Sequence, residues 1–120
     1  MIYGVGIDIT DIARIKAAQK RNSRFKRRIL TQAELAVYET LTAKRQAEYL
    51  AGRFSVKESF SKALGTGFRN LSFLEIEVLD NANGQPLATK SPFSGRVLIS
   101  ISHTKTLVMT EVILERRMNE

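Results

Sequence analysis

This chain of 120 residues contains no cysteine and no tryptophan, and it has only two prolines and one histidine. Without cysteine it can form neither a disulfide nor a thiolate zinc site, and it has no thiol nucleophile. No apolar run approaches the roughly 20 residues that a membrane-spanning helix needs. The N-terminus also lacks the basic segment and apolar run of a signal peptide. We therefore expect a single domain, residues 1–120, that works in the cytoplasm and does not bind a membrane.

Acidic residues are the scarcer charge: 12 Asp and Glu stand against 19 Lys and Arg, which gives a formal net charge of +7. Such an excess indicates an anionic partner, which can be a nucleic acid, a phosphorylated small molecule, an acidic protein or a membrane surface. Much of the excess lies in the first quarter of the chain, where only two acids occur. The basic residues there are Arg14, Lys16, Lys20, Arg21, Arg24, Lys26, Arg27 and Arg28. A solvated basic surface that raises solubility would show the same cluster.

The N-terminal segment Ile2–Ile9 alternates apolar with small residues, which predicts a strand. One face of this strand carries Gly4, Gly6 and Asp8. Two glycines on the same face indicate that another part of the molecule approaches the backbone closely there.

Two short helices are predicted after this strand. Thr10 or Asp11 can cap a helix from about Ile12 to Lys20. Thr31 and Glu34 have the spacing of a capping box for the second helix.

A long helix is predicted from Lys44 to Leu64. One side of it forms an apolar stripe typical of a core-facing surface. That stripe consists of Tyr49, Val56, Phe60 and Ala63. The roughly opposite side combines an aromatic ring, a carboxylate, a hydroxyl and a glycine, with an amine beside them, and a plain solvated face would not need the ring or the glycine. These residues are Phe54, Glu58, Ser61, Gly65 and Lys62.

The remainder of the chain has the pattern of strands and turns. Leu74–Val78 alternates like a half-buried strand, and Asn81–Pro86 has the composition of a turn. Val97–Ile101 and Leu107–Leu114 flank a short loop containing His103, which predicts an antiparallel hairpin. The predicted fold is α+β, an antiparallel sheet packed with one long helix and two or more shorter ones.

Asp8 and Glu58 are candidates for a magnesium site, because Mg²⁺ commonly takes one or two protein carboxylates and completes its octahedron with waters and substrate phosphates. Each acid alone is more simply a cap or a surface charge. Lys62 is suited to contact phosphate oxygens, although it can equally pair with Glu58 one turn earlier. His103 stands in a donor-rich loop, yet a lone histidine is more often a hydrogen-bonded structural residue.

Four motifs resemble the holo-acyl-carrier-protein synthases, the short bacterial type of 4'-phosphopantetheinyl transferase. They are Gly4–Ile9 (GVGIDI), Arg53–Ala63 (RFSVKESFSKA), Gly65–Gly67 (GTG) and Ile101–Thr104 (ISHT). Their order and separations match the family across essentially the whole chain. The second motif is highly specific, whereas the first and last would be weak alone.

The resemblance implies a role for each matching residue. Asp8 and Glu58 match the magnesium ligands, and Lys62 matches a lysine near the phosphates, so these three are the implied catalytic residues. The implied pocket for coenzyme A adds residues from four segments: Phe54, Ser61, Gly65, Pro86, His103 and Thr104. Gln85 departs from the lysine that is common before the proline in this family. Lys44, Arg45 and Arg53 are further candidates for phosphate or partner contacts.

The resemblance also implies the reaction and its partners. The family transfers 4'-phosphopantetheine from coenzyme A to a serine of apo acyl carrier protein, with release of 3',5'-ADP, in support of fatty acid biosynthesis. Its short members form homotrimers with active sites between subunits. The acidic carrier protein would dock on the basic N-terminal quarter, for which the expected contacts are Arg14, Arg21, Arg24 and Arg28.

Two other classes of protein fit parts of the pattern. The basic charge suits a nucleic-acid-binding domain, but only Phe25 lies within the basic cluster, and such domains interleave several aromatic rings. A metal-dependent phosphohydrolase would use the same carboxylates with water as the nucleophile. We expect neither, and we expect no nucleic acid partner.

Overall fold

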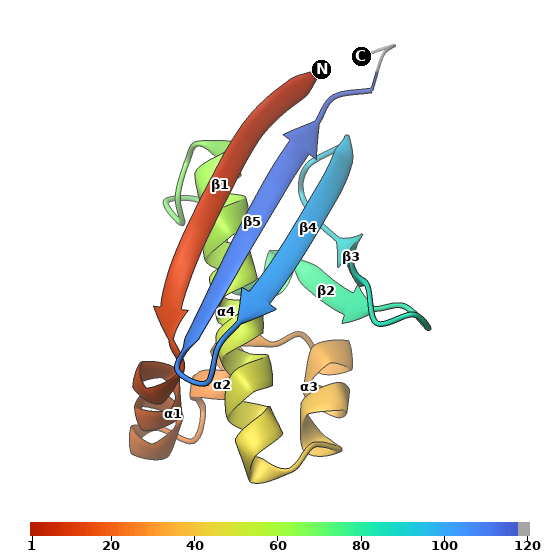
Figure 1. The fold of residues 1–120 in the computed structure, drawn as a ribbon. Helices are drawn as coiled ribbons and strands as arrows, with labels where there is room; N and C mark the ends of the chain where they lie inside the picture. The colour runs from red at the N-terminus through yellow and green to blue at the C-terminus, as the bar shows by residue number, and fades with distance from the viewer. Residues whose placement is uncertain (118–120) are drawn as a thin grey trace.

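The computed structural model describes residues 1–117, which form five strands, four α-helices and one short 3₁₀ helix (Figure 1). In chain order the elements are β1 (Ile2–Asp11), α1 (Ile12–Arg21), α2 (Phe25–Ile29), α3 (Gln32–Glu39), α4 (Ala43–Leu64), η1 (Phe73–Glu75), β2 (Glu77–Asp80), β3 (Pro86–Lys90), β4 (Arg96–His103) and β5 (Leu107–Glu115).

The main sheet has three antiparallel strands in the order β1-β5-β4, and β2 and β3 form a separate antiparallel pair. The long helix α4 lies across one face of the main sheet, while α1, α2 and α3 gather around its N-terminal half (Figure 1). The predicted α+β architecture is therefore confirmed. The predicted hairpin is also confirmed, because β4 pairs with β5 from Arg96 opposite Glu115 to His103 opposite Val108.

Helix α4 approaches β1 so closely that the strand has no room for side chains at the contact. A Cβ atom on Gly4 would overlap the carbonyl oxygen of Ala63, and one on Gly6 would overlap that of Ser59. The close approach predicted from the two glycines is thus confirmed, and the approaching element is α4. This contact fixes Asp8, two residues further along β1, against the helix.

The core lies between the sheet and the helices in two clusters. One joins α1, α2 and α3 to the first half of α4, around Ile15, Leu50 and Val108. The other joins the second half of α4 to β2 and β5, around Phe60 and Leu114. In the predicted apolar stripe of the helix, Val56, Phe60 and Ala63 are buried, whereas Tyr49 is only partly buried.

A buried ion pair ties α4 to α3. The Lys57 amine donates to Glu34 Oε1 and to the carbonyl oxygen of Ile29, each over 2.6 Å, and both charged side chains are 0% exposed. The Glu34 carboxylate also accepts from the backbone N–H of Thr31 (2.8 Å) and of Val78 (2.8 Å). Glu34 therefore closes the predicted capping box of α3 and holds β2 at the same time.

The face of the main sheet that points away from α4 is apolar and exposed. Nothing in residues 1–117 covers it (Figure 1). Its large side chains come from all three strands: Val5, Ile7, Ile9, Leu98, Leu107 and Met109.

Two predictions about local structure were wrong or incomplete. Leu74–Val78 is not one strand: Phe73–Glu75 forms a 3₁₀ turn with a capping box between Ser72 and Glu75, and the strand starts only at Glu77. The short helix α2 was not predicted, because its five residues are mostly basic and carry no side-chain cap. No helix in the described part of the chain is long and apolar enough to cross a membrane.

Candidate active site

Asp8 lies near the end of β1 and faces α4. Its Oδ2 accepts hydrogen bonds from the hydroxyls of Thr10 (2.6 Å) and Ser55 (2.8 Å). Its Oδ1 lies 3.3 Å from the amine of Lys62. The side chain of Asp8 is 13% exposed, so the carboxylate is mostly buried but still reaches solvent. Two hydrogen bonds already occupy its Oδ2.

Lys62 lies on α4, one turn after Glu58, and its amine donates to the carbonyl oxygen of Ile7 over 3.0 Å as well as to Asp8. Within residues 1–117 its ion pair is with Asp8, and the alternative pairing with Glu58 is not formed. Because 52% of the Lys62 side chain is exposed, the amine can exchange these partners for a ligand.

Glu58 is half-buried, and in the described part of the chain its carboxylate makes no hydrogen bond or ion pair. Burial raises the pKa of Glu58, and the negative charge of Asp8 raises it further, while Lys62 and Arg14 act in the opposite direction. Two carboxylates thus face each other with two cations nearby.

This arrangement suits a hard divalent cation. The described residues hold no group of three or more His, Asp or Glu side chains that could bind a metal. A site of two carboxylates nonetheless matches the common mode for Mg²⁺, in which substrate phosphates and waters supply the other oxygens. A cation would also relieve the repulsion between Asp8 and the unpartnered Glu58.

Aromatic rings extend from this site along α4. The rings of Phe54 and Phe73 stack at 5.5 Å, Phe73 and Phe68 stack at 4.1 Å, and Phe25 lies 6.3 Å from Phe54. The Arg14 guanidinium of α1 lies 5.8 Å from the Phe54 ring, and it is close enough to Glu58 to lower the pKa of that carboxyl group. Phe54 was predicted to line a pocket, but the other rings were missed because they come from separate segments.

Ser61 and Gly65 lie at the C-terminal end of α4. The Ser61 hydroxyl is buried and donates to the carbonyl oxygen of Glu58 over 2.7 Å. Gly65 has a φ of 92° and ends the helix with its N–H bonded to the carbonyl oxygens of Ser61 and Lys62. A residue with a side chain would be strained in this left-handed conformation, which explains the glycine.

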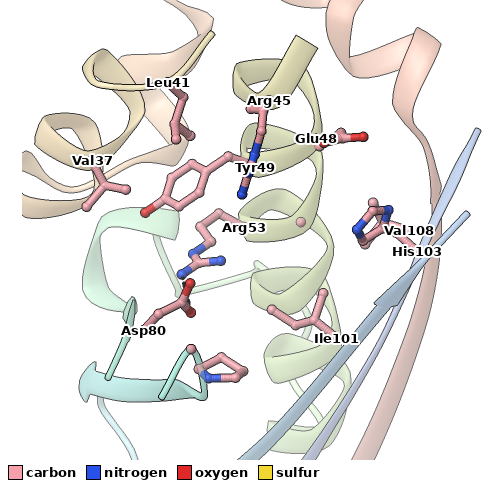
Figure 2. A pocket seen from close by; sticks show the side chains of 13 residues that line it. Val37, Leu41, Arg45, Glu48, Tyr49, Arg53, Asp80, Ile101, His103 and Val108 are labelled. Atoms are coloured by element: carbon pink, nitrogen blue, oxygen red, sulfur yellow. Dashed lines mark hydrogen bonds and ion pairs between the residues drawn. The ribbon is translucent and has the colours of Figure 1, made fainter. Parts of the chain in front are cut away.

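His103 and Pro86 lie elsewhere, in a cavity of about 350 Å³ between α4, the turn after β2 and the end of β4 (Figure 2). In addition to these two, the lining includes Arg45, Glu48, Tyr49, Gly84 and Val108. Thr104 is not part of this lining; its Oγ1 accepts from the backbone N–H groups of Thr106 and Leu107 and so closes the hairpin loop.

Arg53 is the most firmly held cation of this cavity. Its guanidinium donates to the carbonyl oxygen of Val78 (3.1 Å) and to Asp80 Oδ1 (3.0 Å), and it lies 4.3 Å from the ring of Tyr49. Figure 2 shows this side chain reaching from α4 toward Asp80. Burial raises the pKa of Tyr49 to about 12, so the ring stays a neutral platform for the arginine.

The structure therefore divides the predicted site residues into two groups. Asp8, Glu58 and Lys62 meet on one side of α4, and none of them lines the cavity of His103 and Pro86. Arg21, Arg24 and Arg28 lie in α1, in the link to α2 and in α2, and all three are exposed, as is Arg14.

Comparisons with known proteins identify the family. The family model described as the 4'-phosphopantetheinyl transferase superfamily matches residues 4–112. A holo-[acyl-carrier-protein] synthase of Lacticaseibacillus casei is 57% identical over 116 residues, which span 97% of this chain and 94% of the relative. One from Streptococcus mutans is 52% identical over 96% of this chain and 97% of its own length. The chain belongs to the holo-[acyl-carrier-protein] synthase family.

Solved structures of this family have the same fold. The holo-[acyl-carrier-protein] synthase of Bacillus anthracis, in complex with CoA (3',5'-ADP), matches with a TM-score of 0.89 and 42% identity over 98% of this chain and 99% of that one. The enzyme of Helicobacter pylori in complex with coenzyme A matches with a TM-score of 0.80 and 32% identity over 92% and 99% of the two chains. The resemblance read from the four sequence motifs is confirmed, as is the prediction that the chain is an enzyme of this kind.

Proposed function

We propose that this enzyme transfers the 4'-phosphopantetheine group of coenzyme A to a serine of apo acyl carrier protein and releases 3',5'-ADP, in support of fatty acid biosynthesis in the cytoplasm. The observation that carries the proposal is the meeting of Asp8, Glu58 and Lys62 at a place where the Glu58 carboxylate has no partner within residues 1–117. The names of the relatives and the coenzyme A complexes among the similar structures support the substrate pair.

In this reaction the serine oxygen of the carrier protein bonds to the β-phosphorus of coenzyme A. The bond from that phosphorus to the bridging oxygen breaks, and 3',5'-ADP leaves with the electron pair while the serine proton passes to a base. Negative charge builds on the phosphoryl and leaving oxygens, so the enzyme has to supply positioning and positive charge rather than a nucleophile.

Asp8 and Glu58 would hold a magnesium ion, which when bound supplies Lewis-acid polarisation of the diphosphate oxygens. Asp8 would offer Oδ1, because two hydroxyls already occupy its Oδ2. Lys62 would turn its exposed amine from Asp8 to the phosphates, and Arg14 would add a second positive charge near the same place. Asp8→Ala or Glu58→Ala should therefore abolish transfer, whereas Lys62→Ala should raise the barrier by only about 3–4 kcal/mol.

The active form is a homotrimer with active sites between subunits. Two observations support this assembly: the exposed apolar face of the main sheet needs a cover, and the two groups of site residues lie apart in one chain. Mixing Asp8→Ala subunits with His103→Ala subunits tests the arrangement. Restored activity is expected, because some sites then combine an intact Asp8 from one copy with an intact His103 from another. Mixtures no more active than the separate variants would contradict shared sites.

The acidic carrier protein docks on the basic docking surface, which we define as Arg14, Arg21, Arg24 and Arg28. These arginines are exposed and continue from α1 into α2. Arg14 links this surface to the reaction centre, because it contacts Phe54 and lies close enough to Glu58 to affect its pKa. A serine presented beside Arg14 would thus lie next to the phosphate.

Phosphorus NMR of coenzyme A tests the reaction class. We expect 3',5'-ADP to appear only when apo carrier protein is present, and in an amount equal to the modified carrier. Release of 3',5'-ADP without the carrier would identify a phosphohydrolase instead.

A further inference from the structure

Three buried hydroxyl groups form a continuous chain that ends on the Asp8 carboxylate. The Ser59 and Thr110 hydroxyl oxygens are 2.6 Å apart, those of Thr110 and Ser55 are 2.8 Å apart, and Ser55 donates to Asp8 Oδ2 over 2.8 Å. Ser55 and Ser59 are 0% exposed, and Thr110 is 1% exposed. The chain therefore crosses from α4 to β5 and back without contact with solvent.

The direction of each hydrogen bond follows from the number of protons. The Asp8 carboxylate, which pairs with Lys62, can only accept, so Ser55 uses its single proton on Asp8. Ser55 must then accept from Thr110, which uses its own proton. The Ser59 hydroxyl therefore donates to Thr110, and it has two acceptors there, the hydroxyl oxygen at 2.6 Å and the carbonyl oxygen at 3.2 Å. All three dipoles consequently point toward Asp8, and chains of this kind strengthen each member by polarisation.

Packing of the core alone does not explain why residue 110 carries a hydroxyl group. Thr110 lies opposite Asp8 in the pairing of β1 with β5, in the inward-facing row that also contains Val108 and Val112. A valine would fill the same volume without burying a polar group, which costs free energy unless it is hydrogen-bonded. Ser55 and Ser59, one helical turn apart, supply the two hydrogen bonds that this hydroxyl needs.

We propose that Ser55, Thr110 and Ser59 are positioning residues for the metal site: Ser55 and Thr10 occupy Asp8 Oδ2, and Thr110 and Ser59 hold the Ser55 hydroxyl in place, so that only Oδ1 is presented to the cation and to Lys62. The proposal rests on the proposed function, because it assumes a divalent cation at Asp8 and Glu58. Partners behind a metal ligand fix its orientation, and their loss typically weakens metal binding by about 10- to 100-fold.

The test is the affinity for Mn²⁺, measured by electron paramagnetic resonance of the free ion with coenzyme A present and no carrier protein. Ser55→Ala should weaken binding about 10-fold or more, because it removes a donor from the ligand itself. Thr110→Val should weaken it less, and Thr110→Ser should restore the value of the unchanged enzyme. The double variant Ser55→Ala/Thr110→Val should be no worse than Ser55→Ala, since Thr110 acts through Ser55.

A matched control separates positioning from general damage to the core. Val112 lies two residues from Thr110 on the same face of β5, in the apolar cluster of Phe60 and Leu114, and Val112→Ala removes no hydrogen-bonding group; it should lower the melting temperature and leave Mn²⁺ affinity unchanged. If Thr110→Val does not fold, Ser59→Ala removes the first donor of the chain and should show the same modest loss.

The Mn²⁺ measurements distinguish a failure of the positioning role from a failure of the metal site. Equal Mn²⁺ affinity of Ser55→Ala, Thr110→Val and the unchanged enzyme would overturn the positioning role while Asp8→Asn still loses the metal. No Mn²⁺ binding by the unchanged enzyme, or equal binding by Asp8→Asn, would instead refute the metal site itself.

Discussion

Replacing Lys57 with methionine should destabilise the enzyme strongly, although within residues 1–117 its amine contacts only Glu34 and Ile29 and none of the predicted site residues. Its amine and the Glu34 carboxylate are both 0% exposed, and they meet at 2.6 Å. Lys57→Met leaves the Glu34 charge buried without its cation and the carbonyl oxygen of Ile29 without its donor. Removing one partner of a buried pair costs about 3–5 kcal/mol.

For a domain of this size, each kcal/mol shifts the melting temperature by roughly 4 °C, so we expect a loss of about 12–20 °C. Adding Glu34→Gln to Lys57→Met should recover part of this loss, because the uncompensated charge disappears. The recovery cannot be complete. The Glu34 carboxylate also accepts from the N–H groups of Thr31 and Val78, and a neutral amide offers a single acceptor oxygen for both.

Urea unfolding at a fixed protein concentration measures these differences, with unchanged m-values as the sign that only stability has moved. Lys62→Met is the matched control: it makes the same substitution on the same helix, but its ion pair with Asp8 is at the surface, where such pairs contribute about 0–1 kcal/mol. A Lys57→Met variant no less stable than Lys62→Met would refute the reasoning.

Three further predictions concern the site and its supports. The pKa of Glu58 is raised in the folded state, so the contribution of this group to stability is present below its unfolded pKa and is lost as pH rises through the folded value. Glu58→Gln should therefore raise the melting temperature of the metal-free protein at pH 7 while abolishing transfer. An unchanged melting temperature would argue that the charged Glu58 carboxylate does not destabilise the fold. Gly6→Ala should unfold the protein or move α4 off the sheet, visible as lost near-ultraviolet circular dichroism, because the new methyl group would overlap the Ser59 carbonyl; a native spectrum and stability would contradict this. Reversing the charges of Arg21 and Arg24, the docking arginines that do not act on Glu58, should raise the KM for carrier protein and not that for coenzyme A, by a factor that shrinks as salt rises, whereas equal losses for both substrates would exclude a docking role.

The elements with strong local patterns could be predicted from the sequence. The glycine-bearing strand, the long helix and the capping box of Thr31 and Glu34 all formed as expected. The prediction of one strand over Leu74–Val78 was wrong. A 3₁₀ turn followed by a strand gives the same alternation of exposed and buried positions, with Leu74 outside and Ile76 inside.

The meeting of Asp8, Glu58 and Lys62 could be anticipated because each residue belongs to a recognisable motif. The residues that support the site could not be predicted from the sequence. The contacts of Lys57 and of the hydroxyl chain depend on which strand and which helix become neighbours in the fold. One sequence feature could have pointed to Thr110: it is the single polar residue among the inward-facing positions of β5, where its neighbours are Val108, Val112 and Leu114.

The most direct test of the central claim is a mass spectrum of apo acyl carrier protein after incubation with this enzyme, coenzyme A and magnesium. We expect that the carrier gains one 4'-phosphopantetheine group on a serine, and that Asp8→Ala enzyme leaves the carrier unmodified. An unmodified carrier with the unchanged enzyme, or a modified one with Asp8→Ala, would contradict this claim.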